Sequence, residues 1–117
     1  MFGGLIKMKS TRDYSDQQEK HIALVTGGKV QSNSGGTRFG GGDVHTDKFL
    51  IEAKTKAKAS KSFSIREEWL KKMFEQAFEQ RKDEAVLCIR FDPDINTDYY
   101  VLTERQFLEY LEWKESL

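Results

Sequence analysis

Two acidic side chains and a lysine lie close together in one segment of the 117-residue chain. Asp43 is followed, after a stretch that can turn tightly, by Glu52 and Lys54 in the alternating segment KFLIEAK. Side chains two positions apart on a strand share a face, so Glu52 and Lys54 would project together. Two carboxylates on one face can hold Mg²⁺, and a nearby lysine can stabilise charge that develops on phosphorus. This set favours hydrolysis of a phosphodiester bond.

The relative position of the two carboxylates depends on the turn that joins their segments. A tight turn over His45–Lys48 places Asp43 opposite Leu50 and diagonal to Glu52, on the face that Glu52 shares. The backbone carbonyl of Ala53 could add another metal ligand. The alternative is that Asp43 is a turn residue after three glycines and that the strand carries a solvated polar face.

A third carboxylate, Glu19, lies in a predicted helix. Glu19 precedes Ile22 by three residues, and Ile22 precedes Val25 by three, so Glu19 lies near the apolar side of the helix. A carboxylate near a buried face needs a partner, which a metal site would supply. The alternative is that Glu19 lies at the rim of the helix and reaches water.

The segment from residue 34 to residue 42 (SGGTRFGGG) holds five glycines and predicts a loop. Its backbone could approach a phosphate chain closely, with Arg38 in contact with phosphate and Ser34 or Thr37 as a hydrogen-bond donor. The segment lacks the G-K-[ST] ending of a nucleotide-binding P-loop. Loop flexibility alone is the alternative explanation.

A net charge of zero conceals an asymmetry between the two halves of the chain. Residues 1–66 hold 12 Lys and Arg against 6 Asp and Glu, whereas residues 67–117 hold 7 against 13. A basic, glycine-rich half is typical of a protein that binds a polyanion, although ordinary surface charge can also cluster by chance. The length of 117 residues and the 12% aromatic content indicate a single folded domain over residues 1–117.

Several classes of protein are excluded by composition. The single cysteine, Cys88, excludes an internal disulfide framework and a zinc cluster, and fits a reducing cytoplasm. The two histidines, His21 and His45, show no metal-ligand spacing with it. No apolar run approaches 18 residues, so we expect no membrane span, and Met1–Lys9 lacks the apolar region and cleavage site of a secretory signal.

Three capping boxes predict where helices begin. They occur at Ser15–Gln18, Ser64–Glu67 and Thr103–Gln106. The first helix would end at Gly27-Gly28, and the second would run to about Lys82. Apolar spacing predicts that the last two helices bury the following side chains: Trp69, Leu70, Met73, Phe74, Ala77 and Phe78 in the second, and Phe107, Leu108 and Leu111 in the third.

Strands are predicted between the helices. They cover residues 30–32, 48–54, 85–90 and 99–102, with a turn at Asp92–Asp94. The run at 85–90 is almost continuously apolar, as expected of a central strand. The order of elements predicts an α/β fold in which helices flank a mixed central sheet.

This arrangement resembles the PD-(D/E)xK nuclease superfamily, through its helix glutamate, Gly/Ser-rich loop, aspartate and E-x-K on a hydrophobic strand. Within the superfamily it is most similar to the small Holliday junction resolvases of archaea and their phage-type relatives. The resemblance covers Ser15 to Arg90. It implies a restriction-endonuclease-like fold, Mg²⁺ or Mn²⁺ as cofactor, a symmetric homodimer, and paired nicks in four-way DNA junctions during DNA recombination and repair.

The resemblance also implies roles for individual residues. Asp43 and Glu52 match the acidic metal ligands, Lys54 matches the catalytic lysine, and Glu19 matches the helix glutamate at the metal site. For the serine often implicated in the resolvases we choose Ser34, with Ser32 and Thr37 as close alternatives. Two departures are that Gly42, not proline, precedes Asp43, and that the interval from Asp43 to Glu52 is short.

Basic side chains outside the acidic pair would bind the DNA backbone. They are Lys7, Lys9, Arg38, Lys56, Lys58 and Lys61. The helix over residues 66–82 or the C-terminal helix with Trp113 could supply a two-fold dimer interface. A PD-(D/E)xK nuclease of other specificity, restriction-like or repair, and a non-catalytic DNA-binding or assembly protein are the alternatives. The small size suits a phage or archaeal gene whose product acts in the cytoplasm.

Overall fold

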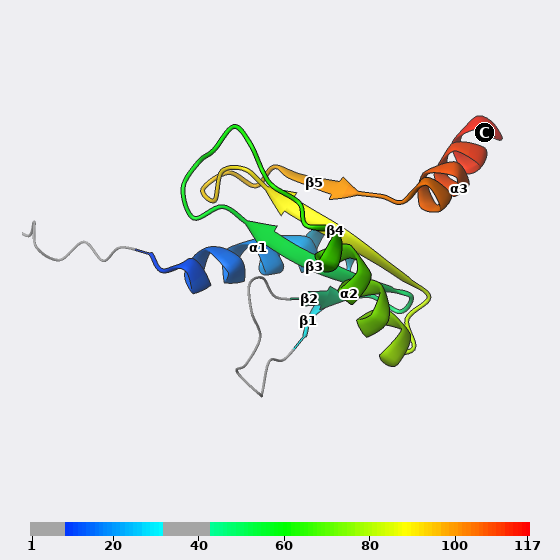
Figure 1. Ribbon diagram of the computed structural model, residues 1–117, viewed down its shortest axis with the longest axis horizontal. Helices are drawn as coiled ribbons and strands as arrows, with labels where there is room; N and C mark the ends of the chain where they lie inside the picture. Colours follow the sequence, from blue (N-terminus) through cyan, green and yellow to red (C-terminus); the bar gives the residue numbers. More distant parts are fainter. Residues whose placement is uncertain (1–8, 32–42) are drawn as a thin grey trace, which may run out of the picture.

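The structure is a computed structural model that describes residues 9–31 and 43–117. Its elements, shown in Figure 1, are α1 (Thr11–Thr26), β1 (Lys29–Val30), β2 (Asp43–His45), β3 (Phe49–Thr55), α2 (Glu67–Glu79), β4 (Glu84–Arg90), β5 (Asp98–Val101) and α3 (Glu104–Glu115). The predicted α/β fold, with a mixed sheet and flanking helices, is confirmed.

The described strands form one five-stranded sheet in the order β1-β2-β3-β4-β5. β3 and β4 are parallel, and the other neighbouring pairs are antiparallel. A parallel pair needs a crossover connection, and α2 lies in the connection between β3 and β4. β3 is therefore a central strand, with β2 on one side and β4 on the other.

The sheet separates two apolar clusters, each covered by one helix. Ile22 of α1 packs with Ile51 of β3, whereas Met73 of α2 packs with Leu50 of β3. Because neighbouring side chains on a strand point to opposite faces, α1 and α2 cover opposite faces of the sheet. Figure 1 shows α2 in front of the strands and α1 behind them. The face on which a residue of β3 lies therefore tells which helix it meets.

The first helix begins earlier than predicted. Ser10, not Ser15, is the N-cap of α1: its hydroxyl accepts a hydrogen bond from the Asp13 amide at 3.2 Å, and the Asp13 carboxylate accepts one from the Ser10 amide at 2.9 Å. This reciprocal pair is itself a capping box, so Ser15 lies inside the helix. The predicted end is confirmed, because Gly27 adopts the left-handed conformation of a C-cap (φ 75°).

The second helix differs from its prediction at both ends. Its N-cap is Arg66, which makes no capping hydrogen bond through its side chain, so the capping box at Ser64–Glu67 is wrong. The helix ends at Glu79, where the left-handed conformation of Arg81 (φ 60°) turns the chain before the predicted end at Lys82. Five of the predicted apolar residues pack on the sheet: Trp69, Leu70, Met73, Phe74 and Ala77. Phe78 is 83% exposed, against the prediction.

β3, β4 and β5 lie within about a residue of their predicted bounds, whereas no strand was predicted at β2 and the first strand differs. That strand covers Lys29–Val30, whereas the predicted strand at 30–32 extends into residues that the structure does not describe. The Gly-rich segment 34–42 also lies outside the described residues. The pattern of burial confirms the central position of β4, since every residue from Ala85 to Arg90 is buried.

The third helix is attached to the sheet by polar contacts rather than by its apolar side. Its predicted cap is confirmed, with Thr103 as N-cap and Gln106 completing the capping box. The Gln106 amide donates hydrogen bonds to the Ala85 carbonyl at 2.8 Å and the Glu84 carboxylate at 3.0 Å, and Arg105 makes two contacts of 2.8 Å with Glu84.

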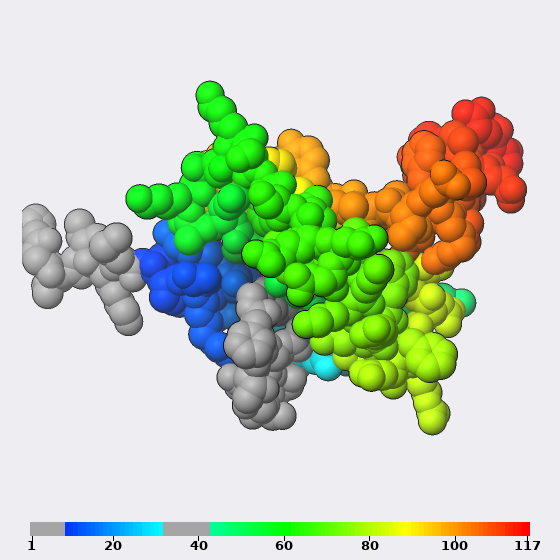
Figure 2. Space-filling model, in the orientation of Figure 1, coloured from blue at the N-terminus to red at the C-terminus, as the bar shows by residue number. Residues whose placement is uncertain are grey.

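The apolar stripe of α3, which we define as Phe107, Leu108 and Leu111, is consequently exposed. The exposed fractions of these side chains are 48%, 51% and 38%, so the predicted burial of this stripe is wrong. In a helix, residues one, two and five positions after Gln106 do not share its face, and the polar attachment therefore turns the stripe outward. Figures 1 and 2 show α3 standing away from the body of the sheet at the end of β5.

Candidate active site

Asp43 and Glu52 are direct partners across the β2–β3 hairpin. The register pairs Asp43 with Glu52 and His45 with Leu50, so the predicted pairing of Asp43 with Leu50 is wrong by two residues. The turn is tighter than the predicted turn over His45–Lys48, because Thr46 and Phe49 are hydrogen-bonded to each other. The Thr46 amide donates to the Phe49 carbonyl and the Thr46 hydroxyl accepts from the Phe49 amide, both at 3.0 Å. A shift of two residues preserves the face, so the two carboxylates still lie on one side of the sheet.

Both carboxylates are buried. Asp43 is 1% exposed and Glu52 is 8% exposed. A solvated polar face, which was the alternative interpretation of these residues, does not fit this burial. Ionised carboxylates are retained inside proteins only when charged groups or hydrogen bonds compensate for lost hydration.

Lys54 lies on the same face, between a carboxylate and an aromatic ring. Its ammonium nitrogen is 3.9 Å from Glu52 Oε2 and 4.6 Å from the centre of the Trp69 ring. The side chain of Lys54 is only 15% exposed. Since Trp69 belongs to α2, this contact also fixes the acidic pair on the face of the sheet that α2 covers.

The two carboxylates form a donor set that suits a divalent cation. In antiparallel sheets the Cβ atoms of direct partners are about 4.5–5.5 Å apart, which allows both side chains to reach one ion. Mg²⁺ commonly binds one or two carboxylates and keeps several waters. β3 also continues past Glu52 to Ala53, the next residue along the strand from the acidic pair. Asp43, Glu52 and the Ala53 carbonyl are thus the groups that could hold the ion.

Glu19 is placed differently from the other three site residues. It is 8% exposed, in agreement with its predicted position near a buried face, but α1 covers the face of the sheet opposite Glu52 and Lys54. Across residues 9–31 and 43–117, the acidic, histidine and cysteine side chains form no group of three or more that could hold a metal ion. The part of Glu19 in metal binding stays a prediction.

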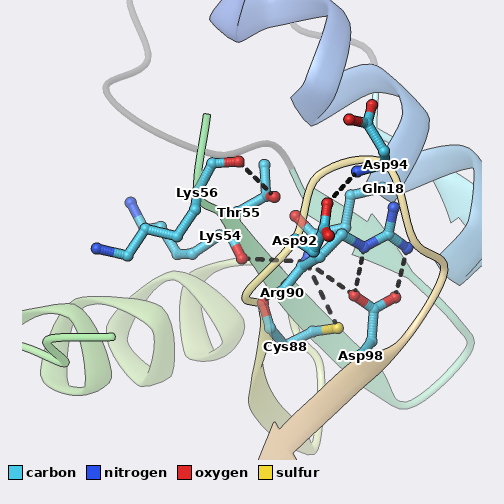
Figure 3. A network of polar contacts seen from close by, with 9 residues as sticks. All are labelled: Gln18, Lys54, Thr55, Lys56, Cys88, Arg90, Asp92, Asp94 and Asp98. Carbon is cyan, nitrogen blue, oxygen red and sulfur yellow. Dashed lines mark hydrogen bonds and ion pairs between the residues drawn. The ribbon is translucent and has the colours of Figure 1, made fainter. Parts of the chain in front are cut away.

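A buried polar network, shown in Figure 3, ties α1 to the ends of three strands. The Gln18 amide nitrogen donates to the Lys54 carbonyl at 3.1 Å, to the Cys88 carbonyl at 3.3 Å and to Asp98 Oδ1 at 3.4 Å. Asp98 in turn receives two hydrogen bonds of 2.8 Å from Arg90. The network holds the backbone of Lys54 against α1 and thereby helps to set the direction in which its side chain leaves the strand.

The sequence predicted no role in the site for Gln18, Arg90 or Asp98, and Gln18, expected to complete a capping box with Ser15, instead lies in this buried network. One signal was present, since Arg90 is a charge at the last position of an apolar strand and such a residue needs a partner when buried. Nothing in the sequence spacing linked it to Asp98 or Gln18, because a turn of variable length and a distant helix supply those partners.

Cys88 occupies the core position expected of it. It is fully buried, and burial, together with the nearby negative charge of Asp98, raises the pKa of its thiol to about 12. A thiol with this pKa stays protonated at neutral pH, so Cys88 is unsuited to act as a nucleophile.

The predicted DNA-binding lysines fall into two groups. Lys56, Lys58 and Lys61 follow β3 directly, and the Lys56 ammonium lies 5.4 Å from the centre of the Phe63 ring. Lys9 lies before α1 and pairs with Asp94 at 3.9 Å. The remaining predicted contacts lie outside the described residues: Lys7, Ser32, Ser34, Thr37 and Arg38. The first group extends the positive charge of Lys54 along one segment of the chain.

Comparisons with known proteins add no relative. In the part of the chain that the structure describes, no helix has the length and apolarity needed to cross a membrane. No protein-family model matches the chain, and neither a curated protein nor a solved structure matches it. The chemistry of the site residues is therefore what indicates a function for this chain.

Proposed function

We propose that this protein is a metal-dependent, structure-specific DNA endonuclease, and specifically a Holliday junction resolvase that nicks four-way junctions. The observation that carries the proposal is the direct pairing of Asp43 with Glu52, both buried, with Lys54 on the same face. Paired carboxylates beside a lysine are suited to phosphodiester hydrolysis. The sequence resemblance to the PD-(D/E)xK superfamily supports the same chemistry.

In this proposal Asp43, Glu52 and the Ala53 carbonyl hold Mg²⁺ or Mn²⁺. Glu19 is proposed as a further acidic residue at the metal site, as the sequence resemblance implies. A bound cation would polarise the phosphodiester and lower the pKa of water at the site. The oxygen of a water molecule bonds to phosphorus, one P–O ester bond breaks, and the leaving oxygen takes up a proton. The Lys54 ammonium stabilises the negative charge that grows on the phosphate oxygens.

The basic segment after β3 would bind the DNA backbone. Lys56, Lys58 and Lys61 follow the strand that carries Glu52 and Lys54, so a phosphate chain bound there would pass the acidic pair. Contacts of this kind carry no base sequence and weaken as salt concentration rises. They suit an enzyme that recognises the shape of a junction.

The direct test is cleavage of a labelled four-way junction, compared with linear duplex and single strand, with and without Mg²⁺ or Mn²⁺. We expect symmetric, cation-dependent nicks in the junction only. Cleavage of all three substrates would retain the chemistry and favour a PD-(D/E)xK nuclease of another specificity. Junction binding without cleavage in either cation would favour the non-catalytic DNA-binding protein.

A two-fold dimer would present two such sites to the two symmetric strands of a junction. The apolar stripe of α3 supports α3 as its interface. Phe107, Leu108 and Leu111 share one side of α3 and would form the centre of such an interface, to which each partner commonly contributes roughly 800 Å². Antiparallel packing of two α3 helices centred near Glu109 would also place Lys114 opposite Glu104 of the partner subunit.

We expect Leu111→Glu to convert the dimer to a monomer, because it places a charge in the centre of the apolar stripe. Sedimentation velocity at micromolar concentration measures the change. Leu24→Glu is the matched control, since Leu24 is 80% exposed on α1 and lies outside α3. A wild-type protein that sediments as a monomer, or a Leu111→Glu variant that remains dimeric, contradicts this interface.

A further inference from the structure

We propose that Trp69 is a positioning residue, whose indole face holds the Lys54 ammonium beside the Asp43–Glu52 pair. The proposal rests on the proposed nuclease function for its catalytic consequence, but not for its structural content. The distance of 4.6 Å from Lys54 Nζ to the ring centre is within the range of a cation–π interaction. Tryptophan is the side chain that makes this interaction most strongly.

Glu52 alone does not hold the ammonium firmly. The separation of 3.9 Å between Lys54 Nζ and Glu52 Oε2 is longer than a charge-assisted hydrogen bond, which is about 2.7–2.9 Å. A carboxylate that binds a cation also shares its negative charge with that cation, so its attraction for the ammonium falls. The indole face is an uncharged site that attracts the ammonium without competing for the same carboxylate oxygens.

The ring under Lys54 is itself fixed by a row of aromatic side chains. Phe63 meets Trp69 edge to face at 6.5 Å, Phe91 meets Phe63 at 5.9 Å, and Tyr99 meets Phe91 at 5.6 Å. The row runs from the first turn of α2 to β5 across the ends of the central strands. Because edge-to-face contacts restrict ring rotation, the indole presents one defined face to Lys54.

This placement gives Trp69 two functions in the same side chain. It packs against the apolar cluster under α2, and it lies within reach of the one lysine that the proposed reaction needs. A tryptophan that only filled space could be replaced by another large apolar side chain without moving Lys54. The two possibilities therefore differ in what happens to the lysine, not in what happens to stability.

The structural test uses the full chain without metal or DNA. In protein labelled with ¹³C-lysine, protons near an indole face resonate upfield, and Lys54→Arg identifies the Lys54 signals. We expect these signals to be displaced upfield in the wild type, less so in Trp69→Phe, and to return to ordinary lysine positions in Trp69→Leu. Phe74→Leu is the control, because Phe74 packs in the same cluster five residues further along α2.

The catalytic test is single-turnover cleavage of a four-way junction in saturating Mg²⁺. We expect Trp69→Leu to lower the rate by about tenfold with junction affinity within twofold of wild type, and Trp69→Phe to recover part of the rate. Phe74→Leu should retain the wild-type rate even where it is equally destabilised in urea.

The Lys54 signals test the positioning role of Trp69, and cleavage by the wild-type protein tests the nuclease function, so the two proposals can fail separately. Lys54 signals at ordinary positions in the folded wild type, or unmoved in folded Trp69→Leu, would overturn the positioning role. Equal rates for Trp69→Leu and Phe74→Leu would also overturn it. A wild-type protein that cleaves no DNA refutes the nuclease, while the displacement of the Lys54 signals still decides whether Trp69 holds the lysine.

Discussion

Replacing Glu52 with glutamine should lower junction cleavage by on the order of a thousandfold or more, with little change in junction affinity. Glutamine keeps the shape of the side chain but removes the negative charge that a divalent cation needs. Glu52 is the residue opposite Asp43 and the neighbour of Lys54, so this one change affects both proposed contacts of the site. Single-turnover cleavage and an equilibrium binding assay in Ca²⁺ measure the two quantities.

Glu79→Gln makes the same chemical change on the exposed surface of α2, outside the proposed interface, and should cleave at the wild-type rate. The Glu52→Gln variant should remain folded without urea, because glutamine keeps the volume of the side chain and removes its charge repulsion from Asp43. If Glu52→Gln cleaves junctions as fast as Glu79→Gln, the acidic pair is not the catalytic site.

Replacing Arg90 with methionine should lower the free energy of unfolding by about 3–5 kcal/mol, the usual cost of removing one partner from a buried ion pair. The side chains of Arg90 and Asp98 are 1% and 4% exposed, and two hydrogen bonds of 2.8 Å join them. Without Arg90, the Asp98 carboxylate would remain buried with the Gln18 amide as its described hydrogen-bond donor. Urea denaturation followed by circular dichroism measures the loss.

A second variant separates the cost of an orphaned charge from the value of the pair. Replacing both residues, Arg90→Met with Asp98→Leu, removes both charges and should recover most of the lost stability. Arg105→Met is the matched control, because Arg105 also makes two 2.8 Å contacts with a carboxylate, that of Glu84, but its side chain is 56% exposed. We expect it to cost about 1 kcal/mol or less. Equal losses for Arg90→Met and Arg105→Met would contradict the role of burial.

The central strands were the part of the fold that the sequence predicted best. The strand-forming residues of KFLIEAK and the apolar run before Arg90 both predict strands, and both strands form at those places. The shared face of Asp43 and Glu52 was also predictable, because it depends only on whether the turn holds an even or an odd number of residues. Their direct pairing was not, since it depends on how the Thr46 side chain closes the turn.

Helix ends and the orientation of α3 were harder to predict from the sequence. Ser10 and Ser15 both offer a capping side chain, and the choice between them depends on where the preceding chain leaves the helix. The stripe of Phe107, Leu108 and Leu111 has the spacing of a buried face, but Gln106 and Arg105 bind Glu84 instead. Sequence periodicity reports which face is apolar and does not say whether this chain or a second one covers it.

The hairpin register has a consequence for the order in which the molecule can fold. The partners across β2 and β3 are at most nine positions apart, whereas β3 pairs with β4 through residues such as Phe49 and Glu84 that are 35 positions apart. Short loops close sooner and at lower entropic cost than long ones. The two carboxylates can therefore meet while the folding chain is still open to solvent and before α2 brings the Trp69 ring to Lys54. Their mutual repulsion would oppose an early hairpin, and dissolved cations that screen it would speed that step.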